Sequence, residues 1–256
     1  LASFGIGNMG QVNKIVTNIE SAFRIEALSG VVLYGNITLY ALIIGIVLMI
    51  LTSLIVIGGL ERIAAFAEKV VPFMVVLFVL GSLVIIGKNY INILPAFRAI
   101  FVNAFKPISA IGGGIGVLVS TVITQGFKRG VFSNEAGLGS SVMVHSNSNV
   151  KEPVAQGMWG IFEVFADTMV VCTMTALVVL TSGIYDMTTG TLAEGVTDAT
   201  LVATAFNSVF TFGNIGQKFI AIVMFLFAFT TVLGWSHYGT KAVEYLFGRR
   251  GVMVYK

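Results

Sequence analysis

The sequence is poor in charge, in cysteine and in histidine, and each shortage excludes a class of protein. Only 11% of its 256 residues are charged, whereas a soluble domain carries about 25%. One cysteine, Cys172, excludes a disulfide framework and a cysteine metal site. The two histidines, His145 and His237, lack the spacing of a zinc site. The net charge of +3 is dispersed along the chain, so no nucleic-acid partner is indicated.

Apolar residues are abundant instead. They make up 56% of the chain and give it a mean hydropathy of +0.94. An all-α membrane protein is therefore predicted, because a run of about 20 apolar residues crosses a bilayer as a helix. The sequence predicts five complete transmembrane spans and one partial span, which lie at about residues 1–19 (partial), 36–59, 70–87, 107–127, 154–180 and 219–238.

The segments between the spans carry further predictions. The chain begins with Leu1 and has no charged n-region, so we expect a fragment without a signal peptide. The charged stretch Glu61–Lys69 is predicted to turn the chain between two spans. Each of the four prolines, which include Pro72, is expected near a helix start.

An external segment is predicted to form an amphipathic lid or interfacial helix, because apolar residues recur in it at helical spacing. These residues are Val202, Phe206, Val209 and Phe210.

Lysine and arginine fall unevenly on the two sides of these spans. Nine lie on one side and six on the other, and the cytoplasmic side usually has the excess. The nine-residue side is therefore predicted to be cytoplasmic. The segment Phe132–Ser140 follows Lys128 and Arg129 directly, so it is predicted at the cytoplasmic mouth.

The span at 107–127 is interrupted near its start by glycines, at which helix formation is weakest. They are Gly112, Gly113, Gly114 and Gly116. One interpretation is close helix packing, since small residues let membrane helices approach. The other is a broken helix whose freed backbone groups bind a zwitterion or a cation. Three consecutive glycines exceed what a packing seam requires, which favours the break.

Asp167 and Thr168 lie inside the apolar run at 154–180. A carboxylate in a membrane costs several kcal/mol unless it is partnered or faces water, so Asp167 is a candidate site residue. A structural hydrogen bond to a neighbouring helix is the alternative, and the sequence leaves both open. Glu163, one helical turn earlier, is interpreted as a solvated charge at the interface.

Thr230 and Thr231 fall near the middle of the last span. Hydroxyl and freed carbonyl oxygens suit a hard cation such as sodium, although a membrane threonine commonly bonds its own backbone one turn back.

Gln11 and Asn8 lie in the partial first span. A buried amide there can bind a substrate carboxylate or lock two helices together. Trp235 is interpreted as an interfacial anchor rather than a substrate wall.

Several motifs resemble those of the alanine or glycine:cation symporter family, the sodium:alanine symporters of bacteria and archaea. The resemblance covers essentially the whole chain, and the Phe132–Ser140 block is its most specific part. The segments that carry it are Leu1–Met9, Ile57–Ala64, Val70–Met74, Arg129–Ser140 and Thr230–Ser236.

The resemblance implies a leucine-transporter-like fold of two inverted repeats, of which this chain would be the third to eighth spans. In that frame the glycine-interrupted span is the broken sixth. Gly112, Gly113, Gly114 and Gly116 would line the substrate site and Gln11 would face it, whereas Thr230 and Thr231 would help to bind sodium. Asp167, Asn134 and Glu135 are the candidates for coupling or gating.

The function that follows is sodium-coupled symport of alanine or glycine by alternating access, in the plasma membrane of a bacterium or archaeon. The expected partners are the amino acid, sodium and the lipid bilayer, with no organic cofactor and no enzymatic activity. A membrane-embedded enzyme would need a converging nucleophile or metal set. Ser133 lacks both the Gly-x-Ser-x-Gly context and an adjacent histidine. An ion channel, the other alternative, would need a polar stripe along several spans.

Overall fold

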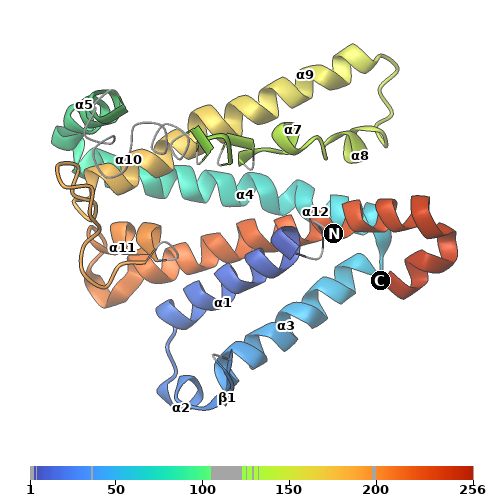
Figure 1. Ribbon diagram of the computed structural model, residues 1–256, viewed down its shortest axis with the longest axis horizontal. Helices are drawn as coiled ribbons and strands as arrows, with labels where there is room; N and C mark the ends of the chain where they lie inside the picture. The colour runs from blue at the N-terminus through green and yellow to red at the C-terminus, as the bar shows by residue number, and fades with distance from the viewer. Residues whose placement is uncertain are drawn as a thin grey trace. The chain divides into compact units, whose positions relative to one another are not determined.

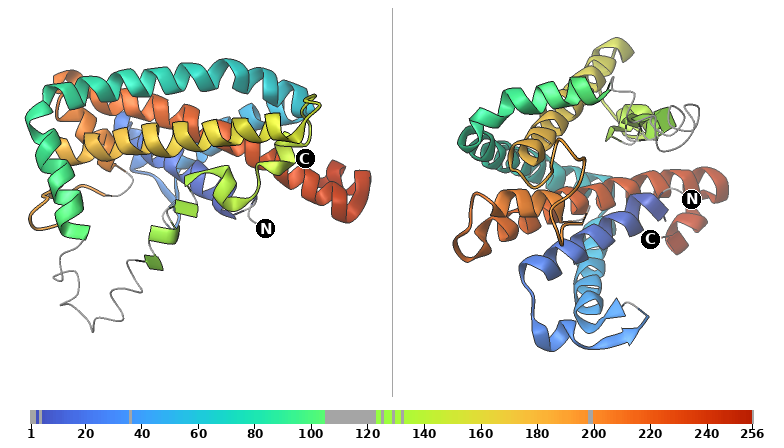
Figure 2. Two further views of the ribbon diagram at one scale, coloured as in Figure 1. Left: turned by 90° about the horizontal axis from the view of Figure 1, so that it is seen from above. Right: turned by 60° about the vertical axis from the view of Figure 1, so that its left-hand side comes forward.

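The computed structural model describes Ser3 and residues 5–35, 37–104, 123–124, 126–128, 130–131, 133–197 and 200–255. The chain forms two compact units. The first unit comprises Leu1–Ile85 and Leu192–Lys256, and the second comprises Ile86–Thr191. Figures 1 and 2 show the helices of each unit.

The first unit is built from long helices with a small hairpin between two of them. Helix α1 packs along α12 and against α3 (Figure 1). The hairpin pairs β1 with β2 in antiparallel fashion. The elements of this unit are η1 (Gly5–Met9, a π-helix), α1 (Gly10–Ala22), α2 (Glu26–Ser29), β1 (Val32–Tyr34), β2 (Ile37–Thr38), α3 (Leu39–Val56), α4 (Gly59–Lys88, up to Ile85), α11 (Leu201–Asn207), η5 (Phe212–Asn214) and α12 (Ile215–Tyr255).

Helices α1, α3, α4 and α12 share one apolar core. Its buried members are Ile15, Leu48, Val56, Ile63, Ala228, Phe229 and Leu233. Helix α11 adds Phe206, which is fully buried and stacks on Phe219 with ring centroids 5.6 Å apart. Leu201–Asn207 of the segment predicted as an amphipathic lid or interfacial helix is helical and buries Phe206 among aromatic rings of the unit, whereas its role as a lid or interfacial helix stays a prediction.

Two predictions about α4 are wrong. Glu61–Lys69 does not turn the chain but is helical, and Pro72 lies inside the helix rather than at its start. The stretch contains alanines and long charged side chains, which are strong helix formers. The charge of the Glu61–Lys69 stretch disfavours burial in lipid, but it is compatible with a helix. Arg62 donates a hydrogen bond from Nη1 to the Leu54 carbonyl near the end of α3, at 2.8 Å.

The second unit contains one long helical stretch with shorter helices beside it. Figure 2 shows α7 and α8 beside this stretch. Asn92 donates to the Thr181 carbonyl at the end of α10 (3.0 Å), and Asn103 donates to the Met187 carbonyl in the segment that follows α10 (3.3 Å). The elements are η2 (Tyr90–Asn92), α5 (Ile93–Ala104), α7 (Glu135–Leu138), α8 (Val142–His145), α9 (Pro153–Val164), η4 (Phe165–Cys172, a π-helix) and α10 (Thr173–Thr181).

Four helices of the described residues are long and apolar enough to cross a membrane. They are Leu39–Val56, Gly59–Lys88, Pro153–Thr181 and Phe212–Tyr255. The last is much longer than the predicted span at 219–238, and Gly248 (φ +66°) interrupts its helical geometry. Pro153 occupies the first turn of α9, as predicted. The glycine-interrupted span at 107–127 lies outside the described residues except for residues 123–124 and 126–127.

Candidate functional site

The segment Ser133–Ser140 folds into a compact turn of helix. Asn134 caps α7, because its Oδ1 accepts a hydrogen bond from the Gly137 backbone N–H at 2.9 Å. Ser140 is buried and its hydroxyl donates to Glu135 Oε2. A Cβ at Gly137 would lie 2.5 Å from the Val131 carbonyl oxygen, so this position has room only for glycine. The small residues of the segment therefore allow a tight fold.

Two side chains of this segment reach the π-helix η4. Ser133 Oγ donates to Asp167 Oδ2 at 2.8 Å, and Asn134 Nδ2 donates to Thr168 Oγ1 at 3.3 Å. All four side chains are half-buried. We call these four residues the Asp167 cluster. The cluster brings together Asn134 and Asp167, both candidates for coupling or gating, and joins them to Ser133 and Thr168.

The Asp167 cluster lies in the interior of a long helical stretch, whereas the prediction that the Phe132–Ser140 block lies at the cytoplasmic mouth stays a prediction. Asp167 lies at the midpoint of the 29-residue stretch Pro153–Thr181, roughly 20 Å of helix from either end at about 1.5 Å per residue. Ser133 and Asn134 therefore contact the middle of this helical stretch. A count of charged residues does not reveal that Ser133 and Asn134 bond a neighbouring helix.

The helix carrying Asp167 is π-helical over eight residues. A π-helix replaces the usual i→i+4 backbone bond by i→i+5, is rare in proteins and is frequently found at functional sites. Neither this geometry nor the pairing of residues 34 positions apart is visible in the sequence. Cys172 ends the π-helix, and its exposed sulfur lies 3.5 Å from Ser133 Oγ. The lone cysteine is therefore a neighbour of the Asp167 cluster.

Thr230 and Thr231 lie in the first unit on regular α-helix. Thr230 Oγ1 donates to the carbonyls of Leu226 (3.0 Å) and Phe227 (2.9 Å), and Thr231 Oγ1 donates to the Phe227 carbonyl (2.9 Å). This is the backbone bonding that membrane threonines commonly show. The bond uses the hydroxyl proton and leaves oxygen lone pairs, so the same geometry is compatible with a cation ligand.

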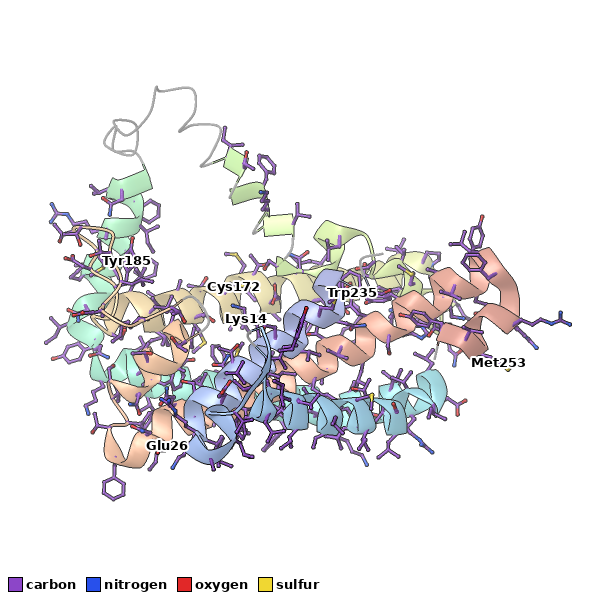
Figure 3. All side chains as sticks on the ribbon, turned by 60° about the horizontal axis from the view of Figure 1, so that its bottom comes forward. Lys14, Glu26, Cys172, Tyr185, Trp235 and Met253 are labelled. Atoms are coloured by element: carbon purple, nitrogen blue, oxygen red, sulfur yellow. The ribbon has the colours of Figure 1, made fainter. Side chains whose placement is uncertain are left out.

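Gln11 is half-buried in the first turn of α1, which follows the π-helix η1. Asn8 lies within η1, and its Oδ1 is buried without a hydrogen-bond partner among the described residues. Trp235, labelled in Figure 3, covers this region: a Cβ at Gly7 would lie 2.4 Å from its indole ring. Trp235 also packs edge-to-face on Tyr238. Trp235 therefore packs against η1 within the unit. The interpretation of Trp235 as an interfacial anchor does not include this contact.

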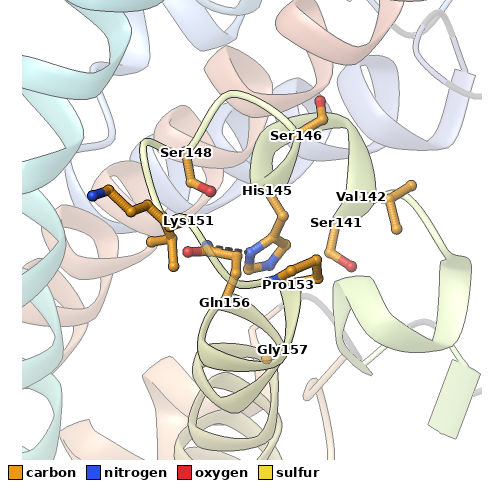
Figure 4. A pocket seen from close by; sticks show the side chains of 11 residues that line it. Ser141, Val142, His145, Ser146, Ser148, Lys151, Pro153, Gln156 and Gly157 are labelled. Carbon is orange, nitrogen blue, oxygen red and sulfur yellow. Dashed lines mark hydrogen bonds between the residues drawn. The ribbon is translucent and has the colours of Figure 1, made fainter.

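A separate cavity of about 560 Å³ opens where α8 meets the start of α9. In Figure 4 the His145 ring faces Gln156, with His145 Nδ1 2.6 Å from Gln156 Nε2. His145 Nε2 lies 3.5 Å from Glu163 Oε2. Glu163 is 55% exposed, as expected of a solvated charge. It also lies beside His145, a contact that this interpretation does not include. Among the described residues, no group of three metal-ligating side chains is present.

The remaining substrate candidates, Gly112, Gly113, Gly114 and Gly116, lie outside the described residues. Their assignment to a broken helix therefore stays a prediction.

Comparison with known proteins agrees with the resemblance seen in the motifs. A profile of the sodium:alanine symporter family matches residues 1–256. The sodium/alanine symporter AgcS of Methanococcus maripaludis is 38% identical over all of this chain and 51% of its own length. The amino-acid carrier protein AlsT and the probable sodium/glutamine symporter GlnT, both of Bacillus subtilis, are 34% and 33% identical over 95% of the chain. The chain spans about half the length of the curated relatives it matches.

Proposed function

Because the chain belongs to the sodium:alanine symporter family, we propose that it takes part in sodium-coupled import of alanine or glycine by alternating access. It is a multi-pass protein of the plasma membrane, with helices long and apolar enough to cross a bilayer. We further propose that the chain forms part of a leucine-transporter-like fold of inverted repeats, as its third to eighth spans. Transporters of that architecture bind substrate and ion near the middle of the membrane, at interrupted helices.

The observation that carries this proposal is the presence of polar pairs in the interiors of apolar helices. Asp167 with Thr168, and Thr230 with Thr231, interrupt helices that otherwise suit lipid. Polar groups at that depth are costly and generally mark substrate or ion pathways. Both pairs supply oxygen, the ligand that hard cations take.

In the proposed mechanism Thr230 and Thr231 contribute hydroxyl oxygens to a sodium site. Gln11 faces the substrate and its amide donates to the carboxylate of the amino acid, in company with the backbone at Gly112, Gly113, Gly114 and Gly116. Asp167, Asn134 and Glu135 belong to the coupling or gating apparatus. Asp167 and Asn134 do so through the bonds of the Asp167 cluster, and Glu135 does so through its bond to Ser140. No covalent step is involved, and no organic cofactor is needed.

Uptake of labelled alanine into vesicles that contain the full-length protein tests this function. An inward sodium gradient should drive alanine above its equilibrium level, and collapse of the gradient should release it. A channel would equilibrate its solute without accumulation, and an enzyme would convert alanine to another compound. Equal uptake with sodium and with choline would refute the proposal.

A further inference from the structure

Helix α5 lies at the level where a membrane-spanning stretch of the second unit ends. The stretch Pro153–Thr181 is long and apolar enough to cross a bilayer, and its last carbonyl accepts a hydrogen bond from Asn92, the residue before α5, at 3.0 Å. Asn103, in the last turn of α5, donates to the Met187 carbonyl in the segment that follows this stretch. Figure 1 shows α5 at this end of α10. Both ends of α5 are therefore held near the boundary of the bilayer, and its 12 residues are too few to cross it.

One side of α5 exposes a stripe of large apolar side chains. Ala96 is fully buried and marks the side of the helix that packs within the unit. Leu94, Phe97 and Phe101 follow one another at i, i+3 and i+7, a spacing that places them on one face. They are 78%, 39% and 65% exposed. Helices that lie in a membrane interface bury such a face in the boundary between headgroups and acyl chains.

Arg98 adds a positive charge beside this stripe. It lies one turn after Leu94 and one turn before Phe101, so the three side chains are neighbours on the helix surface. Arg98 is exposed and forms no ion pair among the described residues. The nearby carboxylate of Asp186 accepts its hydrogen bond from the Thr188 backbone instead.

Arg98 also lines a cavity of about 470 Å³ between α5 and the segment at Met187 and Thr188. The other described residues that line this cavity are uncharged. A guanidinium group binds phosphate oxygens in bidentate fashion. An unpaired guanidinium beside an apolar stripe therefore fits a phosphate group that is joined to acyl chains.

We infer that α5 is an interfacial helix that docks on an acidic phospholipid of the bilayer. Leu94, Phe97 and Phe101 enter the boundary between headgroups and acyl chains, and Arg98 binds the phosphate of the headgroup. Another part of the protein or a second copy would also cover an apolar stripe. The unpaired charge of Arg98 and the position of α5 at the end of a spanning stretch favour the lipid. The inference uses the membrane location of the chain and does not depend on its transport function.

Photocrosslinking identifies what covers the stripe. The photoreactive residue p-benzoylphenylalanine is incorporated in place of Phe101 in the full-length protein, which is reconstituted into vesicles of equal amounts of phosphatidylglycerol and phosphatidylcholine. After irradiation, mass spectrometry should find adducts with phospholipid. The matched control carries the same photoreactive residue in place of Glu194, which is exposed and lies outside the spans, and it should form few lipid adducts. Crosslinks from position 101 to a peptide of the same chain or to a second copy, in place of lipid, would overturn the inference.

The headgroup is tested through Arg98 in the same crosslinking protein. One positive charge near the membrane surface favours an acidic lipid by about fivefold, so adducts with phosphatidylglycerol should exceed those with phosphatidylcholine by this factor. Arg98→Gln should abolish the preference, and Arg98→Lys should keep part of it because the charge remains. Equal adducts with the two lipids when Arg98 is present would overturn the headgroup site. Loss of the preference in excess inorganic phosphate, at constant ionic strength, would assign Arg98 to a soluble anion and overturn the assignment to lipid.

Discussion

The two polar pairs inside apolar helices are satisfied in different ways. Thr230 and Thr231 bond carbonyls one turn back on their own helix, which stays regular. Asp167 and Thr168 bond Ser133 and Asn134, 34 residues earlier in the chain, from a helix that is π-helical at this point. The threonines are satisfied mainly by their own helix, with a longer contact from Thr230 Oγ1 to Met74 Sδ at 3.9 Å, whereas the side chains of Asp167 and Thr168 are satisfied by a tertiary contact.

The chemistry of the side chains accounts for this difference. A hydroxyl carries its own donor, so it can use the carbonyl of the preceding turn and needs no neighbour. An ionised carboxylate only accepts hydrogen bonds, and the backbone N–H groups of its own helix are already used. Asp167 therefore requires donors from another segment. A substitution at Asp167 should therefore disturb a second segment of the chain, whereas a substitution at Thr231 should disturb mainly its own helix.

The largest effect is expected for Asp167→Leu, which removes the acceptor of Ser133 and the charge together. Uptake of alanine should fall to background, and loss of the Ser133 bond should cost about 1–3 kcal/mol of unfolding free energy. Asp167→Asn should retain most of that stability, since its amide oxygen accepts the same bond. Transport assays and thermal unfolding of the full-length protein in detergent separate the two effects. Normal uptake by Asp167→Leu would remove the cluster from the mechanism.

Packing of the first unit is expected to be nearly as sensitive at Gly7. A Cβ there would lie 2.4 Å from the rigid Trp235 ring, and overpacking of this kind costs about 1–3 kcal/mol. Gly7→Ala should lower the unfolding temperature of the protein. Gly10→Ala is the matched control, because nothing lies within 4 Å of a Cβ at that position and alanine favours a helix by up to about 1 kcal/mol. Equal unfolding temperatures for the two variants would show that η1 does not pack closely on Trp235.

The same division between local and tertiary features decides how much could be predicted from the sequence. Hydropathy alone indicates the membrane helices and marks Asp167 and Thr231 as unusual within them. The backbone bonds of the threonines follow from general helix chemistry. The partner of Asp167 could not be predicted, because Ser133 is distant in sequence and the π-helical turns leave no mark in a 3.6-residue period. The predictions for Pro72 and the Glu61–Lys69 stretch are wrong, because local signals for a helix boundary are overridden by the continuation of a long helix.

A smaller effect is expected for Thr231→Val, which keeps the branched shape and removes one oxygen. The sodium concentration for half-maximal uptake should rise roughly tenfold, corresponding to about 1.4 kcal/mol, with little change in unfolding temperature. Thr240→Val is the matched control, since Thr240 also bonds its own helix, through the Ser236 carbonyl, but lies outside the proposed site. If uptake remains measurable and its dependence on sodium concentration is unchanged, the Thr231 hydroxyl only bonds its own helix and is not a sodium ligand.

The smallest effect is expected at Asp186, a carboxylate that is satisfied locally outside the membrane spans. The backbone N–H of Thr188 donates to Asp186 Oδ1 at 2.7 Å. This bond, aided by Thr189, lowers the pKa of Asp186 below its ordinary 3.8. A lowered pKa means that the stabilising contribution is present above pH 3.8 and is lost as the pH falls through the folded-state value.

Hydrogen exchange of the peptide around Thr188 and Thr189, corrected for intrinsic rates, measures the opening of this turn. Between pH 5 and pH 3 the protection should decline in the unaltered protein. In Asp186→Asn it should be independent of pH, because the amide oxygen accepts the same bonds and does not titrate in this range. Alanine uptake should be unchanged in this variant, since the turn has no part in the proposed sodium and substrate sites. The same decline in both proteins would show that another group controls the turn, and an uptake defect would show that a carboxylate satisfied locally can still take part in transport.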